Sequence, residues 1–422
     1  MRRPAVLIAG FSAFLVRELD GLLPAGSVVV LDEPDVIARR RVPGRVARYP
    51  CVAQVIEAPI QHPGFGDGSA LPDLPPGIDA VVPGTEYGVA AAAVLAARSG
   101  LPGIGTAAAP VFQDKQLLRR SLADAVPQPR WAPLTSAEDA YAFAASASGG
   151  VVVKPSRRQG SLGVTLCDRP ADLPAALGRL GELDESLRSA HARPDTFMIE
   201  ERLHGTEVSV EALVADGEIC FANVTDKELF AGPHPVEAGH TVPSRQPAGV
   251  RADLAAAMQG LVAVTGARTT ILHAEWIVDG SGTPWLVECA ARVPGDNICS
   301  LISLARSGSF VGAYLKLLRG GVPPPMPVRG AAAIRFLGAR PGLVTEVAGV
   351  EQARALPGVL DVEVSATQGR TVGVLSSSYG RLGHVTVAGR DLSQVLATAA
   401  RAMTLIRIVT EPPVPTRSTS AR

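Results

Sequence analysis

Apolar and polar side chains alternate most regularly between residues 271 and 292, and this pattern predicts a β-hairpin. Four apolar or small side chains of the first arm fall on one face, whereas His273 and Glu275 fall on the other. A turn rich in glycine follows this arm. If Ser281-Gly282 is a two-residue loop, Glu275 lies directly opposite Glu288, with their Cβ atoms roughly 4.5–5.5 Å apart.

The two facing glutamates would repel each other unless a cation lies between them. Arg292 falls on the same face as Glu288. Two facing carboxylates with an arginine beside them suit a divalent cation that holds a polyphosphate. From the hairpin alone, a solvated polar face is an equally good interpretation, so the rest of the chain must decide.

Residues 4–110 alternate apolar strands with helical segments, which predicts a small doubly wound parallel sheet. The expected elements are strands at 5–9, 28–31 and 80–82, a helix after Gly10 to about residue 23, and a helix at 88–99. The second strand ends in Asp32-Glu33, but the chain contains no G-x-G-x-x-G sequence. Dinucleotide binding is therefore not inferred, and Asp32 is expected to be a helix cap or turn residue.

The next region, 111–322, is predicted to mix helices and strands. Its expected helices are 114–119, one opened by Ser136, helical residues after 170 to about 192, 252–266 and 297–318. Its expected strands before the hairpin are 151–154, 164–166, 197–202, 207–214 and 219–224. Residues 231–249, rich in Pro, Gly and His, are predicted to be a long loop.

A proline-rich segment at 322–327 predicts a linker to a small α+β domain at 328–409. The strands expected in that domain lie near 331–336, 359–364 and 384–387. The tail, 410–422, is rich in Pro, Ser, Thr and Arg and is predicted to be disordered. The expected divisions are therefore 1–110, 111–322 with a lid subdomain at about 130–200, 328–409, and 410–422.

The composition argues against several classes of partner. The 422 residues carry 40 Lys and Arg against 40 Asp and Glu, so charge gives no reason to expect a nucleic acid or an anionic membrane. The five cysteines form no C-x-x-C pair, which predicts reduced thiols in the cytoplasm and no zinc site. The Arg-Arg start before an apolar run resembles a signal peptide, but no small-residue cleavage site follows. A cytoplasmic first strand is therefore favoured.

Lys154 ends a strand and precedes the loop 155–163, which contains two arginines and two glycines. Glycines let backbone N–H groups approach phosphate oxygens, and the arginines add positive charge. The loop is not a Walker A sequence, and an ordinary hairpin loop is the alternative. Further along, a strand ending near Glu200 could present backbone groups to an adenine, and Glu207 could take ribose hydroxyls. Taken alone, the segment around Glu200 and Glu207 is better interpreted as a polar turn between strands. Taken alone, His240 is better interpreted as a surface residue of a loop.

Together the pieces occur in a fixed order: a helix lysine, a strand lysine with a Gly-rich loop, a Glu-rich hinge with Gly-x-Glu, and a two-glutamate hairpin ending in arginine. That order, over about residues 1–320, resembles the ATP-grasp superfamily. Within it, the chain looks most like the L-amino-acid ligases, by the segments Val236–Pro243, His273–Glu275 and Glu288–Asp296. An asparagine common in the wider superfamily is replaced by Ala290, a small residue that the amino-acid ligases share. The C-terminal domain is similar to theirs, more weakly.

The resemblance implies a nucleotide site. Lys115 and Lys154 would hold the phosphates, and Gly160, Ser161 and Gly163 would form a mobile lid. Glu200 and Leu203 would present backbone groups to adenine, and Glu207 would hold the ribose.

The resemblance also implies a metal site and a substrate pocket. Glu275 and Glu288 would bind one or two Mg²⁺ ions, for which Mn²⁺ can substitute. Arg292 would stabilise the transferred phosphoryl group and the later tetrahedral oxyanion. Glu237 and His240 would line the amino-acid pocket, and His240 is a candidate base. Three further polar residues are left without a role: His273, Asp296 and Asn297.

The sequence therefore predicts an ATP-dependent carboxylate–amine ligase that forms an amide through an acyl phosphate and releases ADP and phosphate. The substrates are expected to be an amino acid and a second amino acid or small amine, and the superfamily resemblance suggests a homodimer. One alternative is an ATP-grasp enzyme of purine metabolism or a biotin-dependent carboxylase subunit, against which the segment 233–243 argues. The other is a non-catalytic nucleotide-binding module, which the intact acidic residues and Arg292 disfavour.

Overall fold

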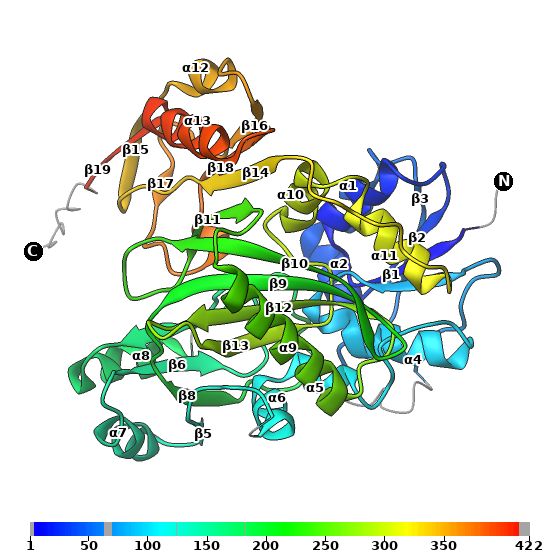
Figure 1. Ribbon diagram of the computed structural model, residues 1–422, viewed down its shortest axis with the longest axis horizontal. Helices are drawn as coiled ribbons and strands as arrows, with labels where there is room; N and C mark the ends of the chain where they lie inside the picture. The colour runs from blue at the N-terminus through cyan, green and yellow to red at the C-terminus, as the bar shows by residue number, and fades with distance from the viewer. Residues whose placement is uncertain (1–3, 63–69, 124, 182, 413–422) are drawn as a thin grey trace, which may run out of the picture.

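The protein is described by a computed structural model that covers residues 4–62, 70–123, 125–181 and 183–412. The strands of these residues form a four-stranded parallel sheet, a four-stranded antiparallel sheet, a central sheet of eight strands and a small sheet of three. In Figure 1 the first strands, in blue, form the parallel sheet, and the last strand, β19, in red, belongs to the three-stranded one. Among the described residues, no helix has the length and apolar character needed to cross a lipid bilayer.

The first region is the doubly wound parallel sheet that the sequence predicts, with strand order β3-β2-β1-β4. Strands β1, β2 and β4 are buried along their whole length, which explains their continuous apolar sequences. The sequence does not predict β3, because this edge strand is exposed or half-buried and lacks an apolar run. The elements are β1 (Val6–Ala9), α1 (Ala13–Asp20), β2 (Val28–Asp32), α2 (Pro34–Arg40), α3 (Val42–Val46), β3 (Val52–Glu57), β4 (Ala80–Pro83), the 3₁₀ helix η2 (Glu86–Gly88) and α4 (Val89–Arg98).

The lid subdomain is an antiparallel sheet of order β5-β8-β6-β7. Alternation along β6 turns Val151 and Val153 into a small core and leaves Lys154 on the face toward the cavity described below. Ser136 caps α7, as predicted, by accepting a hydrogen bond from the backbone N–H of Asp139. The elements, with the two helices that precede them, are α5 (Ala109–Gln113), α6 (Lys115–Leu122), β5 (Trp131–Leu134), α7 (Ala137–Ala145), β6 (Val151–Pro155), β7 (Thr165–Cys167), η3 (Pro170–Asp172), α8 (Leu173–Arg179) and β8 (Phe197–Glu201).

The prediction that helical residues continue to about 192 is wrong. Helix α8 ends at Arg179, and residues 183–196 contain no helix or strand. This stretch lies against the N-terminal region instead, since Asp35 Oδ2 accepts from the N–H of Ala190 at 2.8 Å. Contacts with another region thus replace helical hydrogen bonds.

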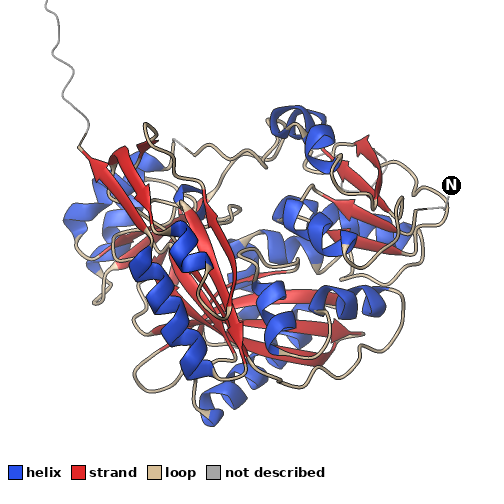
Figure 2. Cartoon of the chain, turned by 90° about the horizontal axis from the view of Figure 1, so that it is seen from above, coloured by secondary structure: helices blue, strands red, loops and turns tan. Residues whose placement is uncertain are grey.

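The central sheet is antiparallel, with strand order β13-β12-β9-β10-β11-β14-β18-β16. Helix α9 lies along one face of it (Figures 1 and 2), where Leu254 and Met258 share a core with Trp276. The loop predicted over 231–249 is wrong in its middle, because β11 forms there between β10 and β14. The elements of this part are β9 (Thr206–Ala215), β10 (Glu218–Leu229), β11 (Glu237–Val242), α9 (Ala248–Thr265), β12 (Thr270–Val278) and β13 (Pro284–Ala290).

The three strands expected in the C-terminal region are present, but they extend the central sheet instead of forming their own. A separate small sheet, β17-β15-β19, lies beside them. Strand β19 reaches Glu411, so residues 410 and 411 of the expected tail belong to a strand, while 413–422 lie outside the described residues. The elements are β14 (Ala331–Phe336), β15 (Gly342–Ala348), α12 (Val350–Arg354), β16 (Val359–Val364), β17 (Thr371–Val372), η4 (Ser378–Gly380), β18 (Gly383–Gly389), α13 (Leu392–Leu405) and β19 (Arg407–Glu411).

Two helices, α10 (Ile298–Ala305) and α11 (Phe310–Leu318), replace the single helix predicted over 297–318. Between them Gly308 has a φ of +90°, and Ser309 caps α11. Apolar side chains of both helices fill one core with those of the parallel sheet and β14. This shared core fixes the N-terminal region against the central sheet.

Candidate active site

Glu275 and Glu288 lie directly opposite each other on β12 and β13, as the hairpin pattern predicts. The two-residue loop assumed for that pairing is wrong. Val278 pairs with Pro284, so the turn spans 279–283, held by backbone N–H groups that donate to Asp279. A one-residue bulge at Val287 then shifts the register and brings Glu288 opposite Glu275.

The bulge adds a polar group to the cavity wall. The carbonyl of Val287 accepts from Arg119 Nη2 at 2.7 Å and from Lys154 Nζ at 3.4 Å. The extra residue of the hairpin therefore helps to hold two cations that come from other parts of the chain.

Each facing glutamate has its own lysine. Lys115, at the start of α6, lies 2.9 Å from Glu288 Oε2, and Lys227, on β10, lies 2.9 Å from Glu275 Oε1. These ammonium groups offset the repulsion that the sequence pattern attributes to the facing pair. The carboxylates are oxygen donors on adjacent strands, which is the donor type that Mg²⁺ prefers.

Lys227 is a central cation that the sequence analysis missed. Its ammonium lies 3.6 Å from Glu207 and 3.7 Å from Glu237, besides Glu275, and its side chain is only 2% exposed. Burial lowers the pKa of Lys227, but the three carboxylates outweigh burial and raise it well above its ordinary value. Burial raises the pKa of Glu207 to about 7. No apolar alternation in the sequence marks it, because residues 225–228 are all polar, although β10 runs on to Leu229.

A second buried ion-pair cluster lies beneath the lid sheet. Glu200 lies 2.6 Å from Lys154 and 2.8 Å from Arg119, and all three are buried. Burial lowers the pKa of Lys154, and the pKa of Glu200 is also lowered, because the two cations outweigh burial there. The side chain of Glu200 thus positions the strand lysine, while Leu203 lies just past the end of β8 and lines the cavity.

The Gly-rich loop between β6 and β7 reaches across to the C-terminal region. Ser161 Oγ donates to the carbonyl of Pro235 at 2.8 Å, and the N–H of Ser378 donates to the carbonyl of Gly160 at 3.1 Å. Gly160 and Gly163 have φ values of +64° and +77°, which glycine adopts without strain. The loop therefore covers the cavity in this structure.

Arg292 is held by a residue from the N-terminal region. Its Nε lies 3.1 Å from Glu86 Oε2, in the 3₁₀ helix after β4. Burial raises the pKa of Glu86, and Arg292 and Lys115 oppose that rise. Glu86 could not be identified from the sequence, because 206 positions separate it from Arg292.

His240 and Asp296 form one wall with a residue from the C-terminal region. His240 Nε2 lies 3.1 Å from Asp296 Oδ2, and Arg381 makes two hydrogen bonds to the same carboxylate, one of 2.8 Å. Burial would raise the pKa of Asp296, but Arg381 and His240 hold it far below its ordinary value. Asn297 lies apart from this wall, since its Oδ1 accepts from Arg17. Asp296 thus has a positioning role that the sequence could not assign.

His273 lies between two glutamates. Its Nδ1 is 3.0 Å from Glu211 Oε1, and its Nε2 is 3.4 Å from Glu275 Oε1. Burial lowers the pKa of His273, but the two carboxylates outweigh burial and raise it to about 9. His273 therefore carries a proton at neutral pH and helps to fix Glu275.

Most of these groups line one cavity of about 770 Å³, whereas Glu86, Arg119, Glu211 and Asn297 do not. Of the site residues predicted from the sequence, all but Gly163 line it. Glu237 also lines it and accepts a hydrogen bond from Ser378 Oγ at 2.7 Å. The N-terminal, lid, central and C-terminal parts of the chain each contribute to its wall.

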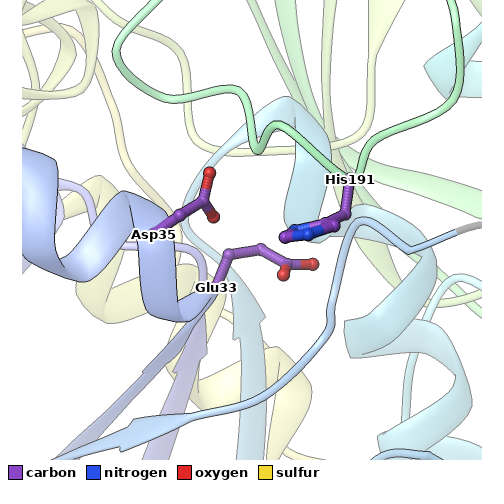
Figure 3. Close-up of side chains that lie close together, drawn as sticks. All are labelled: Glu33, Asp35 and His191. Carbon is purple, nitrogen blue, oxygen red and sulfur yellow. The ribbon is translucent and has the colours of Figure 1, made fainter.

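A separate cluster, Glu33, Asp35 and His191, lies where residues 183–196 meet the N-terminal sheet (Figure 3). Its ligand-type atoms lie within 4.8 Å of one another. Asp35 is already bound by Arg39 and Ser189, at 2.8 and 2.9 Å. The carboxylate of Asp35 thus joins residues 189 and 190 to the N-terminal region.

Comparisons with known proteins agree with this architecture. A family model for the ATP-grasp domain matches residues 148–300, and one for the L-amino acid ligase C-terminal domain 2 matches residues 335–411. An L-arginine-specific L-amino acid ligase from Bacillus subtilis is 24% identical over 313 residues, 71% of this chain and 72% of that protein. An alanine–anticapsin ligase from Bacillus subtilis is 26% identical over 265 residues, 59% of this chain and 56% of that protein.

Solved structures share the fold at lower sequence identity. An L-amino acid ligase from Bacillus licheniformis superposes with a TM-score of 0.74 at 17% identity, over 97% of this chain and 100% of that one. A biotin carboxylase from Campylobacter jejuni superposes with a TM-score of 0.65 at 15% identity, over 97% of this chain and 93% of that one. The fold alone therefore does not separate these enzymes, whereas the C-terminal domain and the sequence relatives do. The chain thus contains an ATP-grasp domain, followed by a domain that matches the C-terminal domain 2 of the L-amino acid ligases.

Proposed function

We propose that this ligase joins the carboxylate of one amino acid to the amine of a second amino acid or small amine, at the expense of ATP. The observation that carries the proposal is the arrangement around Arg292. On one side of the cavity lie the facing glutamates with Lys115 and Lys154, and on another lies the wall of Glu237, His240, Asp296 and Arg381. A nucleotide and an amino acid can thus meet at one guanidinium.

The nucleotide side of the cavity supplies charge and cover. Lys115 and Lys154 would bind the α- and β-phosphates, with the lid residues Gly160, Ser161 and Gly163 above them. Backbone groups of Glu200 and Leu203 would meet the adenine, and Glu207 the ribose. Glu275 and Glu288 would hold Mg²⁺, which offsets the charge of the phosphates when bound. Lys115 and Lys227 pair with these glutamates in this structure. If Mg²⁺ took their place, both ammonium groups could turn toward phosphate oxygens.

The other side would bind the amino acid whose carboxylate becomes phosphorylated. Glu237 offers a carboxylate to its ammonium group, and Arg292 can stabilise the charge of the phosphoryl group and of the tetrahedral oxyanion. The amine then attacks the acyl phosphate, and phosphate leaves. His240 Nε2 is held by Asp296, so a base role for His240 would use Nδ1, which is buried and has no hydrogen-bond partner among the described residues.

A phosphate-release screen tests the proposal. Pairs of amino acids, and of amino acids with small amines, are incubated with Mg²⁺ and ATP, phosphate is measured with malachite green, and positive wells are analysed by mass spectrometry. Amide products are expected from the wild type. At a limiting Mg²⁺ concentration they should be reduced in Glu288→Gln and kept in the exposed control Glu218→Gln. Phosphate release that depends on bicarbonate or a nucleotide precursor would instead support a carboxylase or purine-pathway enzyme, and release with no pair would support a non-catalytic module. Light scattering of the same samples tests the expected homodimer.

A further inference from the structure

Arg40 differs from every other cation that lines the cavity. Each other lysine or arginine in the wall has a carboxylate oxygen within 4.0 Å. Among the described residues, Arg40 has no such partner. An ionised group without a counter-charge is costly to keep in a partly buried position, so its partner is expected to come from a ligand.

The surroundings of Arg40 leave part of its guanidinium free. It ends α2, its Nη1 donates to the carbonyl of Phe11 at 2.6 Å, and its Cζ lies 4.9 Å from the centre of the Phe11 ring. Burial lowers the pKa of Arg40, and Asp32, Tyr379 and Glu185, none of which forms an ion pair with it, only partly oppose that fall. The pKa values of Arg381 and Arg158, which have carboxylate partners, are raised instead.

Arg40 lines the same cavity as Arg292. The pKa of the Tyr379 hydroxyl is raised by burial and by Glu185, and both Arg292 and Arg40 oppose that rise. Arg40 belongs to the N-terminal wall of the cavity, together with Ser12 and Thr85. The lysines proposed for the phosphates belong to the lid sheet and to α6.

We propose that Arg40 binds the carboxylate of the amino acid that supplies the amine. The inference rests on the proposed ligase function. In the proposed site, Lys115 and Lys154 bind the phosphates. Glu237 binds the ammonium of the first amino acid, and Arg292 meets its reacting carboxylate. The carboxylate of the second amino acid is then the one substrate charge without an assigned partner. A guanidinium binds a carboxylate through two parallel hydrogen bonds. Because a single carbon separates the carboxylate and amine of an α-amino acid, this contact also orients the nucleophile.

The experiment compares two acceptors that differ only at this carboxylate. The probes are the amino-acid acceptor found in the phosphate screen and its carboxamide, with saturating ATP and first amino acid. For Arg40→Ala, the KM of the amino acid is expected to rise roughly 10- to 100-fold, as for a lost hydrogen bond between charged groups. The KM of the carboxamide and the KM of ATP should change little. Arg40→Lys, which keeps the charge and loses the fork, should give an intermediate KM.

Arg45→Ala is the matched control, because Arg45 lies 5.2 Å from the same Phe11 ring but is exposed and does not line the cavity. This control should behave as the wild type. If Arg40→Ala does not fold, Arg40→Lys and Arg40→Gln carry the test. Equal losses for the amino acid and its carboxamide, a rise in the KM of the first amino acid alone, or a wild type that accepts only amines without a carboxylate would overturn the inference and leave the ligase function standing. A wild type that releases no phosphate with any pair would remove both.

Discussion

The charge of His273 can be tested directly. Two carboxylates, Glu211 and Glu275, lie within 3.4 Å of its ring nitrogens, and they raise its pKa from the ordinary value of 6.5 to about 9. The imidazolium is therefore favoured in the folded protein by roughly 3 kcal/mol over the unfolded chain, at 1.36 kcal/mol for each pH unit of difference. This stabilisation is fully present below pH 6.5 and is lost as the pH rises through 9.

Histidine labelled with ¹³C at Cε1 gives the measurement, in protein free of metal and nucleotide. The chain has seven histidines, and one ring signal should titrate near pH 9 and be missing in His273→Gln. Thermal unfolding of the wild type should lose more stability between pH 7 and 10 than that of His273→Gln. Several regions can unfold in separate steps, so melting curves do not give one free energy of unfolding. The titration of the ring signal therefore tests the value of the pKa, and the melting curves test only the direction in which stability changes with pH. A His273 signal that titrates near 6.5, or parallel melting profiles, would refute the reasoning. Addition of Mg²⁺ and ADP should lower this pKa, because a second cation would then act on Glu275.

Three further variants test separate parts of the site. Arg292→Ala should lower kcat about 100- to 1000-fold while calorimetry still detects ATP binding, and normal amide formation by this variant would exclude the role of Arg292. Glu288→Gln should raise the Mg²⁺ concentration needed for half-maximal activity at least about tenfold, since one metal ligand is lost, and an unchanged Mg²⁺ dependence would contradict the metal assignment. Burial raises the pKa of Glu207 to about 7, so its ionisation lowers the free energy of unfolding of the nucleotide-free protein as the pH rises from 4.5 through 7. Glu207→Gln should therefore melt higher than the wild type at pH 8 and nearly alike at pH 4.5, with a raised KM for ATP; equal melting at both would argue against that pKa.

The sequence predicted the elements that carry strong local patterns. The parallel strands and the hairpin follow from apolar runs and from alternation, and both are present. The facing pair of Glu275 and Glu288 was predicted correctly from a turn length that is wrong, because the bulge at Val287 compensates for the longer turn. Strand β11 was missed since Glu-Ala-Gly-His-Thr-Val has little β character of its own. It becomes a strand because β10 and β14 pair with its two edges.

The partners of the site residues could not be predicted from spacing. Glu86 meets Arg292, Arg381 meets Asp296, and Lys227 meets three glutamates on other strands. These contacts join segments that only the tertiary fold brings together, and no local periodicity records them.

Asp296 and Arg381 lie on opposite sides of the Pro-rich segment 322–327, yet they form one bidentate pair in the cavity wall. In a chimera with a related ligase, joined in that segment, every domain would be intact, but the residues at positions 296 and 381 would come from different parent proteins. His240 would then depend on an aspartate whose counter-ion comes from another parent. The two regions would therefore have to be exchanged together for the pair, and the position of His240, to be kept.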